Sequence, residues 1–209
     1  MTHDKSEPPW LRWGRELQAI AQNGLAFDAN PYDVERYQQI RSIAAEMIAP
    51  HVDADADTVV DYFLKETGYA TPKIDCRGVV WNTDGKVLLV KGTADEKWTL
   101  PGGWMDVNYS PAENVEREIL EESGLTTRAT RIIALYDKRK HYHRIVHIYQ
   151  VFFECLLISG ELRTSTETSD VGFFGRDEIP ELSLERVSPD QLTQAFHFHD
   201  NPDAPLIFD

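Results

Sequence analysis

Cysteine is scarce in this chain, with two residues among 209. Cys76 and Cys155 both fall in strand-like segments, so buried, reduced thiols are expected and a disulfide is the alternative. The first residues, MTHDKSEPPW, lack the basic start and apolar stretch of a secretory signal. No apolar run approaches the roughly 18 residues that a membrane span requires. These absences predict a cytoplasmic protein with no membrane partner.

Positive charge is also in short supply. The 21 Lys and Arg residues are outnumbered by 35 Asp and Glu residues, which gives a net charge of −14 and a pI of about 4.9. Such a chain repels nucleic acid unless it carries a local basic patch, so nucleic acid is not an expected partner. Repeats and low-complexity segments are absent too. Hydrophobic residues make up 42% of the chain, enough for one ordinary domain and a small appendage.

The sequence pattern changes near residue 70. Residues 1–70 carry apolar side chains at helical spacing, interrupted by Asn-Gly and proline, which predicts three helices. Strand-like segments follow, so we predict a helical domain over 1–70 and a second domain over 71–209. Three helices of this size bury little surface alone, so they are expected to dock on the second domain or on a partner subunit.

The second domain alternates strand-like and helix-like segments. The predicted strands are 73–81, 86–91, 98–100, 131–136, 144–158 and 171–174. A turn at Asn82-Thr83-Asp84-Gly85 predicts that the first two form a hairpin. Helices are expected at 111–123 and 189–198, each introduced by Ser-Pro. Strands around one central helix, with another helix near the end, predict an α/β layered fold.

The helix over 111–123 has strong start and stop signals. Ser110 is a good N-cap, Pro111 fits the first helical position, and Glu113 can complete a capping box with Ser110. Gly124 is suited to end the helix in a left-handed conformation. Before this helix, Gly102 and Gly103 allow the backbone to approach a ligand closely, so the carbonyl of Gly102 is a candidate metal ligand.

The same helix carries three carboxylates on one face. Glu118, Glu121 and Glu122 stand at i, i+3 and i+4, where like charges repel. A divalent cation would remove that repulsion. Hard oxygen ligands suit Mg²⁺ or Mn²⁺, and these ions serve phosphate chemistry. A solvated acidic face is the alternative interpretation.

The segment from 103 to 125 resembles the Nudix box, G-x5-E-x7-R-E-U-x-E-E-x-G-U, where U is aliphatic. The matching positions are Gly103, Arg117, Glu118, Ile119, Glu121, Glu122, Gly124 and Leu125. Tyr109 stands where the box has its first Glu. In the family that Glu supports the arginine and the loop, so the departure puts the support of Arg117 in question. Asp106 and Glu113 are the candidates to replace it.

The resemblance implies a Nudix-like α/β/α sandwich with a mixed sheet, preceded by the small helical domain. It implies Glu118 and Glu122 as metal ligands, with Glu121 close behind and Gly102 adding its carbonyl. A carboxylate must take a proton from water, and this base could be Glu121, Glu122 or a residue of a later loop. Glu167 is the candidate in that loop, and an ordinary surface charge is its alternative.

Several residues are candidates for binding substrate. Arg77 could meet a phosphate, with a surface salt bridge as the alternative. The basic patch is Lys138, Arg139, Lys140, His141 and His143. This patch could attract the phosphates of a substrate, with Lys138 and His141 as the main candidates for contact. The alternative is a solvated loop. Trp104 and Tyr109 could stack a base, and Asp106 lies in the same loop.

The helical domain followed by Pro72-Lys73 resembles a smaller Nudix subgroup that cleaves nucleoside diphosphates linked to another group, such as ADP-ribose or CDP-choline. The prediction is a metal-dependent pyrophosphohydrolase and a homodimer, which releases a nucleoside monophosphate and a phosphorylated product. One alternative is a catalytically weak module that binds a nucleotide, which Tyr109 favours. The other is a sanitising hydrolase of nucleoside triphosphates.

Overall fold

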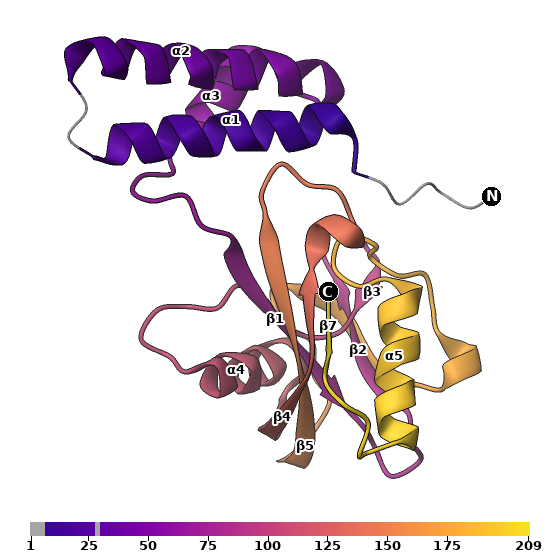
Figure 1. Cartoon of the computed structure of the whole chain (residues 1–209). Coiled ribbons are helices and arrows are strands. Elements are labelled where there is room, and N and C mark those ends of the chain that lie inside the picture. Colours follow the sequence, from indigo (N-terminus) through magenta and orange to yellow (C-terminus); the bar gives the residue numbers. More distant parts are fainter. Residues whose placement is uncertain (1–6, 28–29) are drawn as a thin grey trace. The chain divides into compact units, whose positions relative to one another are not determined.

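The computed structural model describes residues 7–27 and 30–209, which form two compact units (Figure 1). The first unit runs to Lys73 and includes the segment His143–His147. The second unit contains Ile74–Tyr142 and Ile148–Asp209. No helix in these described ranges is long and apolar enough to cross a membrane.

The first unit is helical, as its apolar spacing predicts. It contains α1 (Pro9–Ala26), α2 (Pro31–Ile48), a short 3-10 turn η1 (Ala49–His51) and α3 (Ala56–Leu64). Asparagine and aspartate side chains cap the second and third helices by accepting backbone N–H groups. The core of this unit consists of Ala44, Ala45, Ile48, Val59 and Phe63.

The second unit contains seven strands and two α-helices. The strands are β1 (Lys73–Val80), β2 (Val87–Gly92), β3 (Trp98–Thr99), β4 (Leu125–Asp137), β5 (Ile148–Gly160), β6 (Thr168–Phe174) and β7 (Ile207–Phe208). The helices are α4 (Pro111–Ser123) and α5 (Pro189–Asp200), with 3-10 turns η2 (Lys138–Lys140) and η3 (Arg176–Glu178). One sheet has the order β1-β5-β4-β7 and the other β3-β2-β6. The first sheet is mixed, because β4 is antiparallel to β5 and parallel to β7.

The predicted hairpin between the first two strands is wrong. A turn does form, since the Asn82 side chain accepts the backbone N–H groups of Asp84 and Lys86. Beyond a single bridge between Trp81 and Val87, however, β1 and β2 lie in different sheets. The two strands separate because β1 pairs with β5, while β2 pairs with β3 and β6.

The two helices cover opposite faces of the strands (Figure 1). Alternate residues of β1 divide between two cores: Cys76 and Val80 pack with the core of α4, and Val79 packs with the core of α5. This confirms the α/β/α sandwich. Both cysteines are free and buried, and burial raises the pKa of Cys76 to about 11 and that of Cys155 to about 12. They are therefore core side chains and not reactive thiols.

The close packing of β1 against α4 can be tested by substitution. A Cβ atom at Gly78 would lie 2.5 Å from Cδ1 of Ile119, which is fully buried. We expect Gly78→Ala to destabilise the fold by about 1–3 kcal/mol through overpacking, and Ile119→Ala by about 2–5 kcal/mol through a cavity. The double variant should cost clearly less than the sum, because the new methyl group enters the vacated space. Urea unfolding of the four proteins measures this coupling, and strict additivity would contradict the close packing.

Candidate active site

The helix α4 is built as its sequence predicts. The Ser110 hydroxyl accepts the N–H of Glu113, and the Glu113 carboxylate accepts the N–H of Ser110, which completes the capping box. Gly124 ends the helix at a φ of +78°. A Cβ there would lie 2.6 Å from the carbonyl oxygen of Glu161, so both the conformation and the space require glycine. The helix that carries the carboxylates is thus fixed at both ends.

The glycine loop lies against β1 and is bound to it by backbone hydrogen bonds. The N–H of Gly78 donates to Pro101 O at 2.8 Å, and the N–H of Cys76 donates to Gly103 O at 2.9 Å. Gly102, between them, has a φ of +139°, and a Cβ there would lie 2.1 Å from Cys76 O. A Cβ at Gly103 would lie 2.9 Å from Oε2 of Glu118. Glycine is therefore required at 102 for the loop's approach to β1, whereas a side chain at 103 would displace the Glu118 carboxylate.

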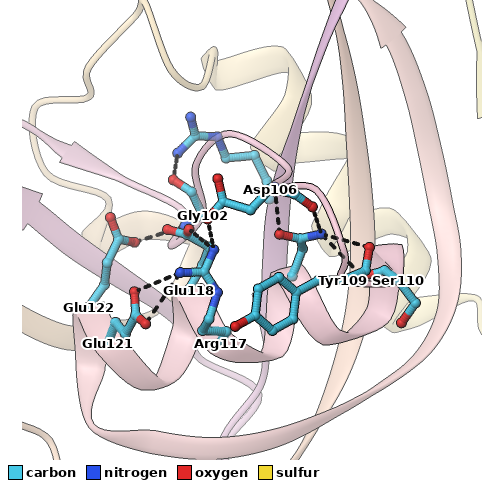
Figure 2. A network of polar contacts seen from close by, with 10 residues as sticks. Gly102, Asp106, Tyr109, Ser110, Arg117, Glu118, Glu121 and Glu122 are labelled. Atoms are coloured by element: carbon cyan, nitrogen blue, oxygen red, sulfur yellow. Dashed lines mark hydrogen bonds and ion pairs between the residues drawn. The ribbon is translucent and has the colours of Figure 1, made fainter.

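Glu118 and Glu122 lie against this loop, and Glu121 lies toward Arg117 (Figure 2). Glu122 accepts the N–H of Gly102 at 2.8 Å, and burial raises the pKa of Glu122 to about 7. Burial also raises the pKa of Glu118, and the negative charges of Glu121 and Glu167 add to this effect. Glu121 is the most exposed of the three and lies 3.4 Å from the Arg117 guanidinium. The helix and the glycine loop thus bring together the acidic residues that the sequence pattern selects.

The donor chemistry of this face fits a hard divalent cation, because every candidate ligand is an oxygen. The carboxylates are held by other contacts, however, and the described ranges contain no ready-made cluster of three His, Cys, Asp or Glu side chains around a single point. Glu121 pairs with Arg117, and Glu122 is bound to the Gly102 N–H. The Gly102 carbonyl, a predicted ligand, already accepts Nη1 of Arg77 at 2.6 Å. An ion would have to exchange these contacts for its own.

Arg117 is supported by Asp106, which replaces the glutamate missing at position 109. Its Nη2 lies 2.6 Å from Oδ2 of Asp106, and its guanidinium also lies over the Tyr109 ring, 5.1 Å from the centroid (Figure 2). Of the two predicted substitutes, Asp106 makes the contact, while the Glu113 carboxylate is used in the capping box. Arg117 is therefore supported even though Tyr109 stands where the box has glutamate.

Asn114 is a site residue that the sequence interpretation missed. It is 1% exposed, its Oδ1 accepts the N–H of Asp106 at 2.8 Å, and its Nδ2 lies within hydrogen-bond distance of three carbonyl oxygens in the loop. It thereby ties the loop that carries Asp106 and Tyr109 to α4. A polar side chain beside the apolar stripe of the helix was the available signal.

Arg77 is buried, so the alternative of a surface salt bridge is wrong, and its role toward a phosphate stays a prediction. It is 5% exposed, and its guanidinium donates to the carbonyls of Gly102 and Leu100 at 2.6 and 3.3 Å. Its Nη2 also lies 3.3 Å from Oδ2 of Asp75, a buried carboxylate that the sequence interpretation missed. Arg77 therefore holds the glycine loop in place from the α5 side of β1.

The predicted basic patch is largely neutralised within the second unit. Lys138 is 4% exposed, with its Nζ 3.5 Å from Oδ2 of Asp75, so it is not a solvent-facing phosphate attractor. Arg139 pairs with Asp137, and Nε2 of His141 lies 3.1 Å from Oδ2 of Asp209. Asp137 is a neighbour in sequence, whereas Asp75 and Asp209 are distant in sequence and are brought to this segment by the fold.

Glu167 is held beside the acidic helix. Its carbonyl accepts the N–H of Thr93 at 2.9 Å, and the next residue, Thr168, donates its hydroxyl to Glu122 O at 2.9 Å. The carboxylate of Glu167 is exposed and close enough to contribute to the raised pKa of Glu118. Trp104 and Tyr109, the predicted stacking residues, are about half exposed, at 48% and 51%. Their rings are accessible, and their role toward a base stays a prediction.

Comparison with known families defines the class of protein. Residues 72–196 match the model of the NUDIX domain, and residues 8–63 match a model described as a UDP-X-like N-terminal oligomerisation domain. The first match covers more than half of the chain and includes the glycine loop, α4 and Glu167. The chain belongs to the Nudix family, whose members generally need divalent metal cations.

Full-length relatives narrow this class. The chain is 42% identical over 207 residues to the Bacillus subtilis (strain 168) protein named "Putative ADP-ribose pyrophosphatase YjhB", covering 98% of this chain and 99% of that protein. A solved UDP-X diphosphatase is 30% identical, with 96% of this chain and 98% of that one covered and a TM-score of 0.64. An ADP-ribose pyrophosphatase from Streptococcus suis 89-1591 is 38% identical, with coverages of 66% and 100% and a TM-score of 0.61. This protein is a Nudix pyrophosphohydrolase with an additional N-terminal helical unit.

The Arg117–Asp106 pair generates a prediction about the departure from the Nudix box. Asp106→Asn removes the carboxylate that holds Arg117, and we expect it to reduce activity by about 10- to 100-fold. Adding Tyr109→Glu restores a carboxylate at the position where the family has it and should recover most of the loss. Steady-state hydrolysis rates measure both effects. A wild-type rate for Asp106→Asn would show that Arg117 needs no such support.

The buried carboxylate of Glu122 generates a prediction about stability and pH. The folded-state pKa of about 7 lies above the ordinary value, so the stability that protonated Glu122 contributes is complete below about pH 4 and is lost as pH rises through 7. Glu122→Gln remains neutral and can keep the Gly102 hydrogen bond. With a chelator present, this variant should be more stable than wild type at pH 8, by on the order of 2 kcal/mol.

At pH 5 the gain from Glu122→Gln should be much smaller, because Glu122 of the folded wild type is then protonated. Urea unfolding at the two pH values measures the difference. Glu121→Gln is the matched control, because the Glu121 side chain is 57% exposed and carries no comparable burial cost. An equal gain for both variants, or a gain that does not depend on pH, would contradict the prediction.

Proposed function

We propose that the enzyme hydrolyses the diphosphate of a nucleoside diphosphate linked to another group, and releases a nucleoside monophosphate and a phosphorylated product. The observation that carries this proposal is the approach of the Gly102-Gly103 loop to Glu118 and Glu122, with Glu167 close by. The full-length relatives, named for ADP-ribose and UDP-X, support the same substrate class. ADP-ribose is the first candidate substrate, and CDP-choline remains in the same class.

Mg²⁺ or Mn²⁺ is the proposed cofactor, with Glu118 and Glu122 as its principal ligands. Glu121 and the Gly102 carbonyl are further donors once they give up Arg117 and Arg77. When bound, such an ion neutralises phosphate charge and lowers the pKa of bound water. Glu167 is the proposed base, because its exposed carboxylate lies beside the acidic helix without a hydrogen bond that would occupy it in the described ranges.

The alternative of a catalytically weak binding module loses its main argument. Tyr109 favoured it on the assumption that Arg117 would be unsupported, and Asp106 supplies that support. Hydrolysis of free nucleoside triphosphates is the second candidate function, because one nucleotide-binding site can serve both substrate classes.

A homodimer is proposed through the helical unit, whose family model is described as an oligomerisation domain. Large apolar side chains remain exposed on α1 and α2, among them Trp13, Ile20 and Ile43. An apolar surface of this kind is typical of an interface. A cytoplasmic location stays a prediction, based on the two free cysteines.

The decisive experiment is a panel of substrates with product identification. ADP-ribose, CDP-choline, UDP-sugars, dinucleotides and nucleoside triphosphates are incubated with Mg²⁺, with Mn²⁺ or with a chelator, and the products are resolved by mass spectrometry. We expect a nucleoside monophosphate from a linked diphosphate, and no turnover with the chelator. Release of pyrophosphate from triphosphates, with no turnover of any linked diphosphate, would overturn the proposed substrate class.

The roles of the carboxylates can be separated by substitution. Glu122→Gln should reduce kcat by at least about 100-fold and weaken Mn²⁺ binding, because it removes a proposed ligand. Glu167→Gln should reduce kcat by a similar factor but leave Mn²⁺ affinity near wild type, because a base acts on water. Glu181→Gln is the control, since this side chain is 77% exposed and pairs with Lys97. Near-normal kcat for Glu122→Gln would count against the assignment.

A further inference from the structure

The internal use of Arg77 and Lys138 raises the question of which cation meets the substrate's phosphates. Arg186, in the segment before α5, has the required properties. Its backbone is held from both sides: its N–H donates to Ser183 O at 2.8 Å, and its carbonyl accepts Nε2 of the fully buried Gln150 at 3.0 Å. The neighbouring Val187 is fully buried. The base of the arginine side chain is therefore firmly positioned.

The guanidinium of Arg186 lies over the end of β2. A Cβ at Gly92 would be 2.3 Å from its Nη1 and 3.4 Å from its Cζ, so glycine at this position makes room for the arginine. Gly92 is paired in register with Thr168 of β6, and the Thr168 hydroxyl donates to Glu122 O. Arg186 thus covers the strand end that supports the acidic helix, and its charge opposes the raised pKa of Glu122.

The donors of Arg186 are less occupied than those of other arginines in this unit. The second unit contains five arginines with a carboxylate oxygen within 3.4 Å: Arg77, Arg117, Arg131, Arg139 and Arg176. For Arg186 the corresponding contact is Asp95 Oδ1 at 3.9 Å, beyond hydrogen-bond distance. That carboxylate is already used, since its Oδ2 accepts the Ser183 hydroxyl at 2.6 Å. The Arg186 side chain is 34% exposed.

We propose that Arg186 binds the diphosphate of the substrate as a bidentate donor from the end of β2, in addition to any contact made by the residues of α4. A planar guanidinium with unused N–H groups matches the geometry of phosphate oxygens, and a firmly held backbone lowers the cost of ordering it. The assignment rests on the proposed function, because it names a residue that binds the diphosphate in that same site.

The test compares Arg186→Gln with two matched variants. We expect Arg186→Gln to raise KM for ADP-ribose by about 10- to 100-fold, and Arg186→Lys to recover part of the loss, because lysine keeps the charge but not the fork. Asp95→Asn removes the weak ion pair but leaves the arginine, so its KM should stay near wild type. Arg128→Gln, which changes an exposed arginine on β4, controls for net charge.

Two outcomes would overturn the role of Arg186. One is an unchanged KM in Arg186→Gln. The other is an equal rise of KM in Asp95→Asn. This would show that the Asp95–Arg186 pair acts only by holding its own segments in place.

A binding measurement distinguishes this proposal from the proposed function. Methylenediphosphonate, which cannot be hydrolysed, is titrated calorimetrically into wild type and Arg186→Gln at a fixed Mg²⁺ concentration. Weaker binding to the variant, by about 10-fold or more, supports Arg186 even if no linked diphosphate is turned over. Equal binding to both proteins, with normal hydrolysis by wild type, rejects Arg186 and leaves the proposed function standing.

Discussion

The site depends on the hydrogen bonds between the glycine loop and β1. These bonds place the N–H of Gly102 within 2.8 Å of Glu122, and they place Gly103 where Glu118 can approach it. Any side chain at Gly102 would meet the carbonyl of Cys76, so the loop could not remain on the strand. Arg77 reinforces the loop from within by binding two of its carbonyls. Loss of this pairing would separate the carboxylates from the backbone that orients them.

The support of Arg117 shows that the fold requires an interaction and not a particular position. A carboxylate is needed within reach of the guanidinium, and Asp106 provides it from three residues before the usual place. Asn114 makes this possible, because its buried amide fixes the loop on which Asp106 lies. The released position 109 is then free for an aromatic ring, which packs on the same guanidinium. Arg117 thus has a carboxylate partner, as the Nudix box requires, but the partner comes from a different position.

The sequence predicts well those features that depend on neighbours along the chain. The capping box at Ser110, the left-handed Gly124 and the acidic face are all set within about four residues, and all are present. The order of strands and helices predicts an α/β layered fold, and the resemblance to the Nudix box implies the sandwich. The wrong hairpin and the burial of Lys138 arise differently. Both depend on competing partners distant in sequence, such as β5 for β1 and Asp75 for Lys138, and no local pattern encodes that choice.

The burial of two cations has a consequence for an acidic enzyme with an anionic substrate. Arg77 and Lys138 share the carboxylate of Asp75, and Arg77 also binds carbonyls of the glycine loop. Their attraction for phosphate is largely spent inside the fold. Under the proposed function, substrate binding would then draw on a bound metal ion and on arginines whose N–H groups remain available. Because the net charge of −14 repels phosphate at a distance, these few groups must supply the attraction locally, where screening by salt is weakest.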